Sequence, residues 1–276
     1  MSTKKKNRSS DPEEVREQVK AGYGRIAREA SGCGCGCGTP SGVADHAKGI
    51  GYREDQIEAV PDGANLGLGC GNPTAIASLA PGEVVVDLGS GAGFDAFLAA
   101  REVGESGRVI GVDMTDEMLA KARANARAGG FANVEFRKGQ IEALPVDDES
   151  VDAIISNCVI NLSPEKDRVF REAHRILRPG GRLMISDIVL EKPLPEAVTA
   201  SLDAYLGCVG GASLRTEYLD LIRQSGFSHI EITGEQNFAG GEAGWLDAAM
   251  EQLGIDEAAA RTVLGAITSL SVLARK

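Results

Sequence analysis

A short apolar segment that runs directly into a glycine-rich loop is the feature that most constrains the fold of this chain. Residues 84–88 read VVVDL, the next five read GSGAG, and a helical pattern follows over 94–103. A strand, a glycine loop and a helix in this order are typical of an open, doubly wound α/β sheet, which binds its ligand beyond the carboxyl ends of parallel strands. The sequence therefore predicts a mostly parallel, Rossmann-like sheet with a ligand site at this loop.

Strand-like and helix-like segments continue to alternate after the loop. Short apolar runs recur up to about residue 190, and longer amphipathic stretches separate them. Such alternation favours parallel strands joined by right-handed crossovers. The expected strands cover 108–113, 134–137, 151–156 and 181–188, and the expected helices between them cover 115–127 and 164–177.

The two ends of the chain depart from this alternation. Asp11-Pro12 predicts a helix start, and we expect this helix to reach about residue 30, before a flexible Cys-bearing loop over 32–42. We expect three parts: an N-terminal helical segment (1–60), a cofactor-binding domain (61–190) and a smaller α+β C-terminal domain (191–276). The remaining expected helices are 54–59, 196–206, 216–225, 243–253 and 256–266, and the remaining strands are 229–233 and 269–274.

The glycine spacing distinguishes between nucleotide cofactors. A dinucleotide fingerprint needs a third glycine at position 94, where this chain has Phe, so Gly-x-Gly-x-Gly favours S-adenosylmethionine. Asp113 ends the next strand, where a carboxylate can accept hydrogen bonds from both ribose hydroxyls. A dinucleotide and a purely structural turn remain the alternatives, and residues 139–145 suit either an adenine pocket against Ile141 or an ordinary turn. The expected cofactor-binding residues are Asp87, Gly89, Gly91, Gly93, Asp113, Met114, Ile141, Glu142 and Asn157.

Composition restricts the partners of the chain. The 276 residues carry a formal charge of −11, which disfavours nucleic acid because such a partner needs a basic face. No apolar run reaches the ~18 residues of a membrane span, and the basic N-terminus has no apolar segment behind it. We therefore expect a cytoplasmic protein without a membrane partner. Its cysteines should be reduced, so metal, metalloid or redox roles are favoured over a structural disulfide framework.

The six cysteines are the second informative feature. Three form the cluster Cys33-Gly34-Cys35-Gly36-Cys37, and the others lie in Gly-, Asn- or Ser-rich contexts at Cys70, Cys158 and Cys208. Cys158 directly follows an expected strand, so it should face the ligand crevice. An inert buried cysteine is the alternative for Cys158, and the cluster could take zinc together with a distant fourth ligand. The histidines, His46, His174 and His229, are isolated and are expected to be surface or capped residues.

These motifs resemble the arsenite S-adenosylmethionine methyltransferases. The resemblance is carried by Tyr23-Gly24, the Cys-rich loop, and the stretches ANLGLGCGNPTA (64–75), VDLGSGAGFDAF (86–97), ISNCVINLSPEK (155–166) and GCVGGA (207–212). It implies that 61–190 is a methyltransferase domain that binds S-adenosylmethionine and that 191–276 lies on the arsenic side. It also implies that Cys70, Cys158 and Cys208 hold As(III), with no other metal, and that one of Cys33, Cys35 and Cys37 joins the redox cycle.

The chemistry of arsenic agrees with this ligand set. As(III) binds up to three soft thiolates in a pyramid and keeps a lone pair that can attack a sulfonium methyl group. The product is formally As(V), so its return to As(III) needs two electrons from a protein dithiol, which an external thiol, thioredoxin or glutathione, then resets. The expected substrates are arsenite and methylarsenite.

Two other functions are compatible with parts of the sequence. A class I methyltransferase that acts on carbon or oxygen of a small organic molecule would need the glycine loop but not the cysteines. A thiol-based protein that sequesters metalloids would need the cysteines but not the glycine loop.

Overall fold

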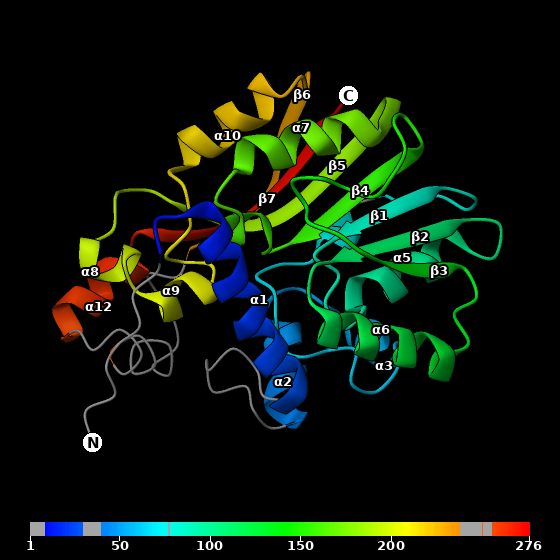
Figure 1. Cartoon of the computed structure of the whole chain (residues 1–276), viewed down its shortest axis with the longest axis horizontal. Coiled ribbons are helices and arrows are strands. Elements are labelled where there is room, and N and C mark those ends of the chain that lie inside the picture. The colour runs from blue at the N-terminus through cyan, green and yellow to red at the C-terminus, as the bar shows by residue number, and fades with distance from the viewer. Residues whose placement is uncertain (1–8, 30–39, 77, 238–249, 251–255) are drawn as a thin grey trace.

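The protein is built on one seven-stranded sheet (Figure 1). A computed structural model describes residues 9–29, 40–76, 78–237, 250 and 256–276. The strands lie in the order β3-β2-β1-β4-β5-β7-β6. Neighbours from β3 to β5 pair in parallel, whereas β7 runs antiparallel to both β5 and β6. The bounds are β1 Val84–Leu88, β2 Arg108–Asp113, β3 Val134–Lys138, β4 Val151–Asn157, β5 Leu177–Leu190, β6 His229–Asn237 and β7 Ile267–Arg275.

Helices cover both faces of this sheet, which confirms the predicted α/β fold. Val85 packs with buried residues of α5 and α6 on one face, while its neighbour Val86 packs with α7 and α10 on the other, because successive strand residues point to opposite sides. The helices are α1 Pro12–Glu29, α2 Pro40–Gly49, α3 Glu54–Glu58, α4 Pro73–Ile76, α5 Phe94–Val103, α6 Asp116–Gly129, the 3-10 turn η1 Ile160–Leu162, α7 Lys166–Ile176, α8 Glu196–Thr199, α9 Leu202–Leu206, α10 Arg215–Gln224 and α12 Glu257–Leu264.

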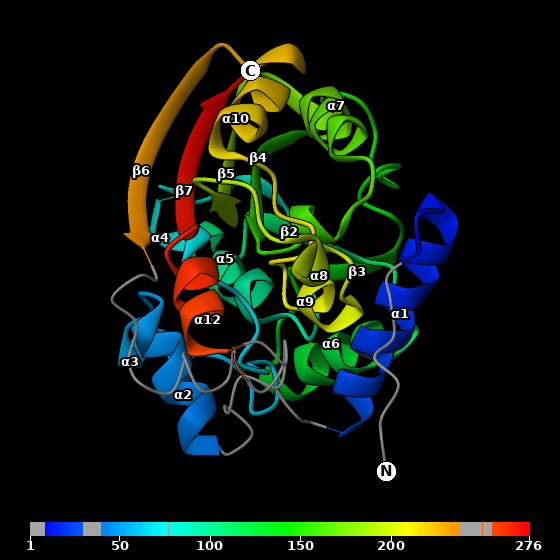
Figure 2. The same cartoon turned by 90° about the vertical axis from the view of Figure 1, so that its left-hand side faces the viewer.

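The segment after residue 190 joins the same sheet. Figure 2 shows β5, β7 and β6 side by side, with α12 leading into β7. The nine-residue pairing of β7 with β5, from Ile267 to Arg275, ties this segment to the parallel core. The boundaries that we expect at residues 60 and 190 stay predictions. No helix among the described residues has the length and apolar character to cross a membrane.

Two of the expected elements need correction, and a third lies outside the described residues. The loop expected over 32–42 ends earlier, because α2 begins at Pro40, and neither α2 nor α4 is expected from the sequence. The single helix expected over 196–206 is two short helices, since the Ser201 hydroxyl accepts a hydrogen bond from the Ala204 backbone nitrogen at 3.3 Å and starts α9. The helix expected over 243–253 lies almost wholly outside the described residues.

The start of α1 follows the expected capping pattern. The Asp11 carboxylate accepts hydrogen bonds from the backbone nitrogens of Glu13 and Glu14 at 2.9 and 3.1 Å. Pro12 occupies the first helical position, where its missing N–H has no intrahelical partner to lose. This cap fixes the beginning of a helix that reaches the ligand cavity.

Candidate active site

The glycine loop lies at the carboxyl end of β1, as expected. Gly89, Gly91 and Gly93 have φ values of 62°, 52° and 99°, in the region that favours glycine. A Cβ at Gly89 would lie 2.3 Å from the Val159 side chain, so this position also requires the smallest residue. The backbone can thus turn sharply between β1 and α5 beside the cavity.

Asp113 connects this loop to the end of β2. One carboxylate oxygen accepts a hydrogen bond from the Gly91 backbone nitrogen at 3.0 Å, and the other accepts one from the Thr115 nitrogen at 2.8 Å. Each oxygen retains a further lone pair for a ligand hydroxyl. Burial raises the pKa of Asp113, although these backbone donors lower it. The position fits the ribose of a nucleoside.

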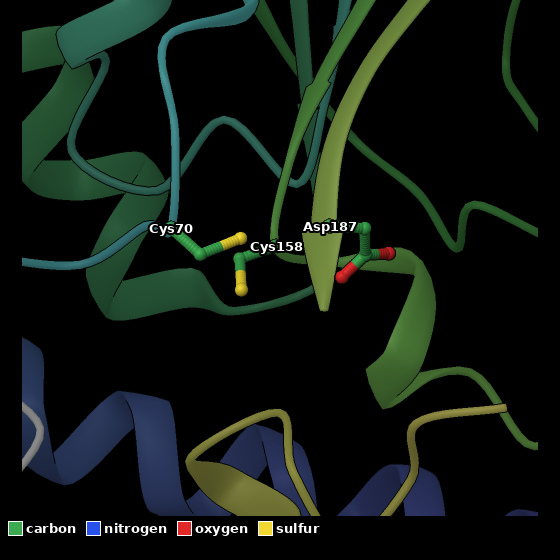
Figure 3. A group of neighbouring side chains, drawn as sticks. All are labelled: Cys70, Cys158 and Asp187. Atoms are coloured by element: carbon green, nitrogen blue, oxygen red, sulfur yellow. The ribbon is translucent and has the colours of Figure 1, made fainter. Parts of the chain in front are cut away.

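A single cavity brings together most of the predicted site residues. It begins at the glycine loop, passes Asp113 and Ile141, and ends at Cys158 and Cys208. Gly93 and Cys70 do not line it: a Cβ at Gly93 would lie 2.6 Å from the Phe97 side chain, and Figure 3 shows Cys70 beside Cys158. The predicted residues that line it are Asp87, Gly89, Gly91, Asp113, Met114, Ile141, Glu142, Asn157, Cys158 and Cys208.

Two buried acidic residues, Asp87 and Asp95, line this cavity. The Oδ2 atom of Asp87 is buried and has no hydrogen-bond partner among the described residues. Burial, together with the charges of Asp95 and Asp113, raises the pKa of Asp87 well above its usual value. Burial also raises the pKa of Asp95 to about 6, although its hydrogen bonds with Tyr52 and Asn157 oppose this rise. A cationic ligand would favour the ionised form of both groups, and S-adenosylmethionine carries an ammonium and a sulfonium, so the cavity fits it.

Asn157 connects the cavity to the loop that carries Cys70. Its side-chain nitrogen lies 2.9, 2.9 and 3.1 Å from the Tyr52 hydroxyl, the Gly71 carbonyl and the Asp95 carboxylate, and its two N–H groups donate among these three acceptors. Its side-chain oxygen accepts a hydrogen bond from the Cys70 backbone nitrogen at 3.1 Å. One residue at the end of β4 therefore orients both a cavity carboxylate and a thiol-bearing loop.

Three cysteines from distant parts of the chain meet at the end of the cavity. Cys70, Cys158 and Cys208 are buried and all are free thiols. The Cys208 sulfur donates to the Cys158 carbonyl at 2.7 Å, and the Cys70 sulfur donates to the Ser186 carbonyl at 3.4 Å. Figure 3 shows the Cys70 thiol pointing toward Cys158. The sequence places only Cys158 at this edge by reasoning from the residues, and the structure brings the other two to it.

Close backbone approaches place these thiols. A Cβ at Gly71 would lie 2.6 Å from the Ser186 Cβ, so only glycine lets the Cys70 loop press against β5. The Cys70 carbonyl then accepts a hydrogen bond from the Ser269 hydroxyl of β7 at 2.5 Å. Cys158 and Cys208 have φ values of 59° and 64°, which are unfavourable for a side chain with a Cβ. Such strain clusters at functional sites and supports a chemical role for both residues.

This arrangement raises the pKa of all three thiols. Burial raises the pKa of Cys70. The hydrogen bond with Cys158 raises the pKa of Cys208 well above its usual value, and burial adds to this effect, while Tyr23 lowers it. The contact with Cys208 lowers the pKa of Cys158, but the hydrogen bond with Cys70, burial and the nearby charges raise it well above its usual value. A soft electrophile that binds the three sulfurs in place of their protons would remove the need for these thiol hydrogen bonds.

Sequence reasoning missed several residues of the site. Asp187 of β5 lies beside the thiols and is fully buried, and burial raises its pKa to about 6 against the effect of the Tyr218 hydroxyl. A lone acid inside the apolar run LMISDIVL is a signal that could have identified it. Asp95 and Tyr52 gave no signal, because an acid in the first turn of a helix and a tyrosine in a loop are both ordinary.

Helix α1 covers both ends of the cavity. Arg16, Val19 and Tyr23 all line it. Arg16 donates to Glu142 at 3.3 Å and also pairs with Glu165. Farther along the helix, the Tyr23 hydroxyl donates to the Leu206 carbonyl at 3.1 Å, two residues before Cys208. The helix therefore contacts the expected adenine end through Arg16 and the thiol end through Tyr23.

The remaining candidates are less central. Cys33, Cys35 and Cys37 lie outside the described residues. His46 is half-buried with Nε2 3.2 Å from the Gly69 carbonyl, His174 packs edge-on against Phe227, and His229 is exposed beside Glu231. None of the three histidines belongs to a potential metal-binding group among the described residues.

The sequence matches the family described as "Methyltransferase domain" over residues 79–226. This match covers the parallel strands, the glycine loop and the end of β4. The chain therefore belongs to the methyltransferase domain family.

Within that family the chain groups with the arsenite methyltransferases. It is 51% identical over 232 residues to one from Halobacterium salinarum, covering 80% of this chain and 59% of that protein. It is 46% identical over 166 residues to one from Aquipseudomonas alcaligenes, covering 58% and 48%. The matched region thus spans only about half of these curated relatives. The crystal structure of CrArsM, an arsenic(III) S-adenosylmethionine methyltransferase from Chlamydomonas reinhardtii, superposes with a TM-score of 0.61 at 33% identity and covers 83% of this chain and 72% of that one.

Proposed function

We propose that this chain transfers a methyl group from S-adenosylmethionine to trivalent arsenic bound by Cys70, Cys158 and Cys208. The observation that carries the proposal is the convergence of these three free, buried thiols, two of which line the cavity that begins at the glycine loop. The activity named for the relatives supports it.

The residues of the cavity have separate tasks in this proposal. S-adenosylmethionine supplies an electrophilic methyl group on a sulfonium. Asp113 binds the ribose, Ile141 lies against the adenine with Glu142 beside it, and Asp87 faces the cationic part of the cofactor. Met114 and Asn157 line the same cavity. Holding two reactants in a near-attack geometry contributes about 7–11 kcal/mol toward a barrier.

The thiols supply the arsenic end of the reaction. Three thiols displace three hydroxides from arsenous acid, and each thiol proton leaves in a water molecule, so loading is neutral in charge. The bound As(III) keeps its lone pair, which forms the new As–C bond while the C–S bond of the sulfonium breaks. Soft thiolates suit this ion better than oxygen ligands do.

A redox step follows methyl transfer. The methylated product is formally As(V), and its reduction to As(III) takes two electrons. We infer that a thiol of the Cys33, Cys35 and Cys37 cluster and a second cysteine form a disulfide and supply them. Thioredoxin or glutathione then restores the dithiol by thiol–disulfide exchange. Methylarsenite would enter the same site as a second substrate, and the cytoplasm would provide the reducing conditions.

Arsenic speciation after incubation with arsenite, S-adenosylmethionine and a thiol tests the proposal. Cys158→Ser and Cys208→Ser should each abolish methylated products, because a hydroxyl is a harder ligand than a thiolate. Calorimetric affinity for S-adenosylmethionine should stay within about twofold, which rules out a collapsed cavity as the cause. Normal turnover by either variant would exclude that cysteine, and unchanged methylation of a small organic acceptor would favour the general methyltransferase function.

The N-terminal cluster needs a separate experiment. Replacing Cys33, Cys35 and Cys37 together by serine should block repeated turnover while leaving S-adenosylmethionine affinity unchanged. Elemental analysis of the purified parent protein is the control. One tightly bound zinc per chain, lost in the triple variant together with fold stability, would show a structural site instead.

A further inference from the structure

A fourth ligand atom lies beside the thiols and has no task in arsenic binding. The sulfurs of Cys70 and Cys158 and one carboxylate oxygen of Asp187 all lie within 4.8 Å of one another (Figure 3). The Cys208 sulfur is outside this group but lies next to Cys158, whose backbone carbonyl it meets at 2.7 Å. As(III) is satisfied by three sulfurs, so the proposed methylation leaves this carboxylate unused.

The Asp187 carboxylate is held in one orientation. Oδ1 accepts hydrogen bonds from the Asn161 side chain at 2.8 Å and from the Ile188 nitrogen at 2.9 Å. Oδ2 accepts one from the Tyr218 hydroxyl at 2.9 Å. Outer partners of this kind fix the ligands of protein metal sites and tune their affinity. A fully buried acid with three donors is thus prepared to act as an oxygen ligand.

We propose that Cys70, Cys158, Cys208 and Asp187 form a four-coordinate site for a thiophilic divalent cation such as Zn²⁺ or Cd²⁺, which competes with arsenite. Three sulfurs and one oxygen are a ligand set that zinc accepts in a tetrahedron, with Zn–S about 2.3 Å and Zn–O about 2.0–2.2 Å. To reach that geometry the three grouped ligand atoms must move closer together, and the Cys208 sulfur must turn toward them. Each thiol releases its proton to the solvent on binding.

The Asp187 carboxylate should distinguish a divalent cation from arsenite. Neutral arsenous acid exchanges hydroxides for thiols and gains nothing from a carboxylate. A divalent cation in a buried pocket needs a fourth donor and the extra negative charge. Removing the charge of Asp187 should therefore weaken cation binding and leave arsenite binding unchanged.

Equilibrium dialysis followed by elemental analysis tests the proposal on the full chain. In every protein of this experiment Cys33, Cys35 and Cys37 are replaced by serine, so that these thiols cannot act as ligands. The protein with these three changes alone is the parent for this comparison. CdCl2 and ZnCl2 should each bind one ion per chain, and MgCl2 should not bind, because it prefers oxygen ligands. Loss of an outer hydrogen-bond partner weakens metal binding by about 10–100-fold. Asp187→Asn removes a ligand, so it should weaken Cd²⁺ binding by more than this, while arsenite affinity should stay within twofold.

Asp152→Asn is the control, since Asp152 is a half-buried acid at the opposite, amino end of β4 and is not grouped with the sulfurs. It should leave Cd²⁺ affinity unchanged. Equal Cd²⁺ affinity of the parent and Asp187→Asn proteins would overturn the proposal.

If Asp187→Asn does not fold, X-ray absorption spectroscopy of the zinc-loaded parent protein tests the proposed ligand set instead. Three sulfur neighbours and one oxygen are expected, and four sulfurs or the absence of bound zinc would overturn the site. The inference uses the thiols of the proposed function, but arsenite binding is measured in its own arm. Cation binding without arsenite binding would reject the proposed function alone, and the reverse result would reject this inference alone.

Discussion

The side-chain oxygen of Asn157 accepts a hydrogen bond from the backbone nitrogen of Cys70 at 3.1 Å. The same side chain donates to Asp95 in the cofactor cavity at 3.1 Å. Methyl transfer requires that the two reactants be held at a fixed separation. Asn157 therefore connects the Cys70 loop, which would hold arsenic, to the Asp95 carboxylate in the cofactor cavity through two hydrogen bonds.

Replacing Asn157 with alanine should therefore impair both ends of the site. The change leaves the Cys70 backbone nitrogen without its partner and removes one hydrogen bond from the Asp95 carboxylate, which keeps the one from Tyr52. We expect this to lower the free energy of unfolding by about 1–3 kcal/mol. Methylation of arsenite should fall by at least about tenfold, because the Cys70 loop loses its orientation. Urea unfolding and arsenic speciation measure the two effects, and full activity would show that the loop is positioned by other contacts.

A second substitution tests the close approach of the Cys70 loop to β5. Gly71→Ala puts a methyl group 2.6 Å from the Ser186 Cβ, so the loop must shift. We expect a loss of stability of about 1–3 kcal/mol and weaker arsenite binding, with S-adenosylmethionine affinity retained. Gly49→Ala is the control, since its Cβ would meet no atom within 4 Å. Similar behaviour of both variants would argue against this steric explanation.

The ion pairs of α1 give a third prediction. The Arg16 side chain is 9% exposed, whereas that of Arg28 is 59% exposed. Arg16→Met leaves the carboxylate of Glu142 buried without its cation, which should destabilise the protein by about 3–5 kcal/mol. Arg28→Met breaks an exposed pair with Glu117 and should change stability by less than about 1 kcal/mol. Chemical denaturation of both variants checks the difference, and equal effects would show that burial of the pair is unimportant.

The pKa of Asp95 predicts an unusual pH dependence. Burial raises this pKa to about 6, above the value of about 3.9 in an unfolded chain. Between these two values the folded protein binds more protons at this residue than the unfolded chain does. The contribution of Asp95 to the free energy of unfolding is therefore complete below about pH 4 and falls as the pH rises through about 6.

Comparison with Asp95→Asn isolates this contribution. The stability of the parent relative to the variant should decrease by on the order of 2 kcal/mol between pH 4 and pH 7. Urea unfolding at several pH values measures it. A difference that stays constant across this range would show that Asp95 titrates normally.

The fold was largely predictable because apolar runs and glycine loops mark parallel strands. Leu88 ends β1 and Asp113 ends β2, both where the sequence indicates, and both residues are buried. The helices at 40–49 and 73–76 were missed because they are short, and their sequences, with Pro, Gly or Ser, also suit loops. The division of the helix at 196–206 depends on one serine hydroxyl that competes for a backbone nitrogen, which periodicity does not reveal.

The site was less predictable than the fold. Cys158 follows a central strand, so its position could be inferred from topology alone. Cys70 and Cys208 could be assigned only by resemblance, because their loops reach the site through tertiary contacts such as that between Gly71 and Ser186. The positive φ of Cys208 and the burial of Asp187 are properties of the assembled structure.

The hydrogen bond from Ser269 to the Cys70 carbonyl also has a consequence for biosynthesis. These residues are 199 positions apart, so at about 5–20 residues per second the ribosome makes Ser269 about 10–40 s after Cys70. During that interval the nascent chain carries the cysteine loop without its partner on β7. A growing polypeptide therefore does not yet offer a complete thiol pocket, and the pocket forms only when β7 has been translated and has docked beside β5.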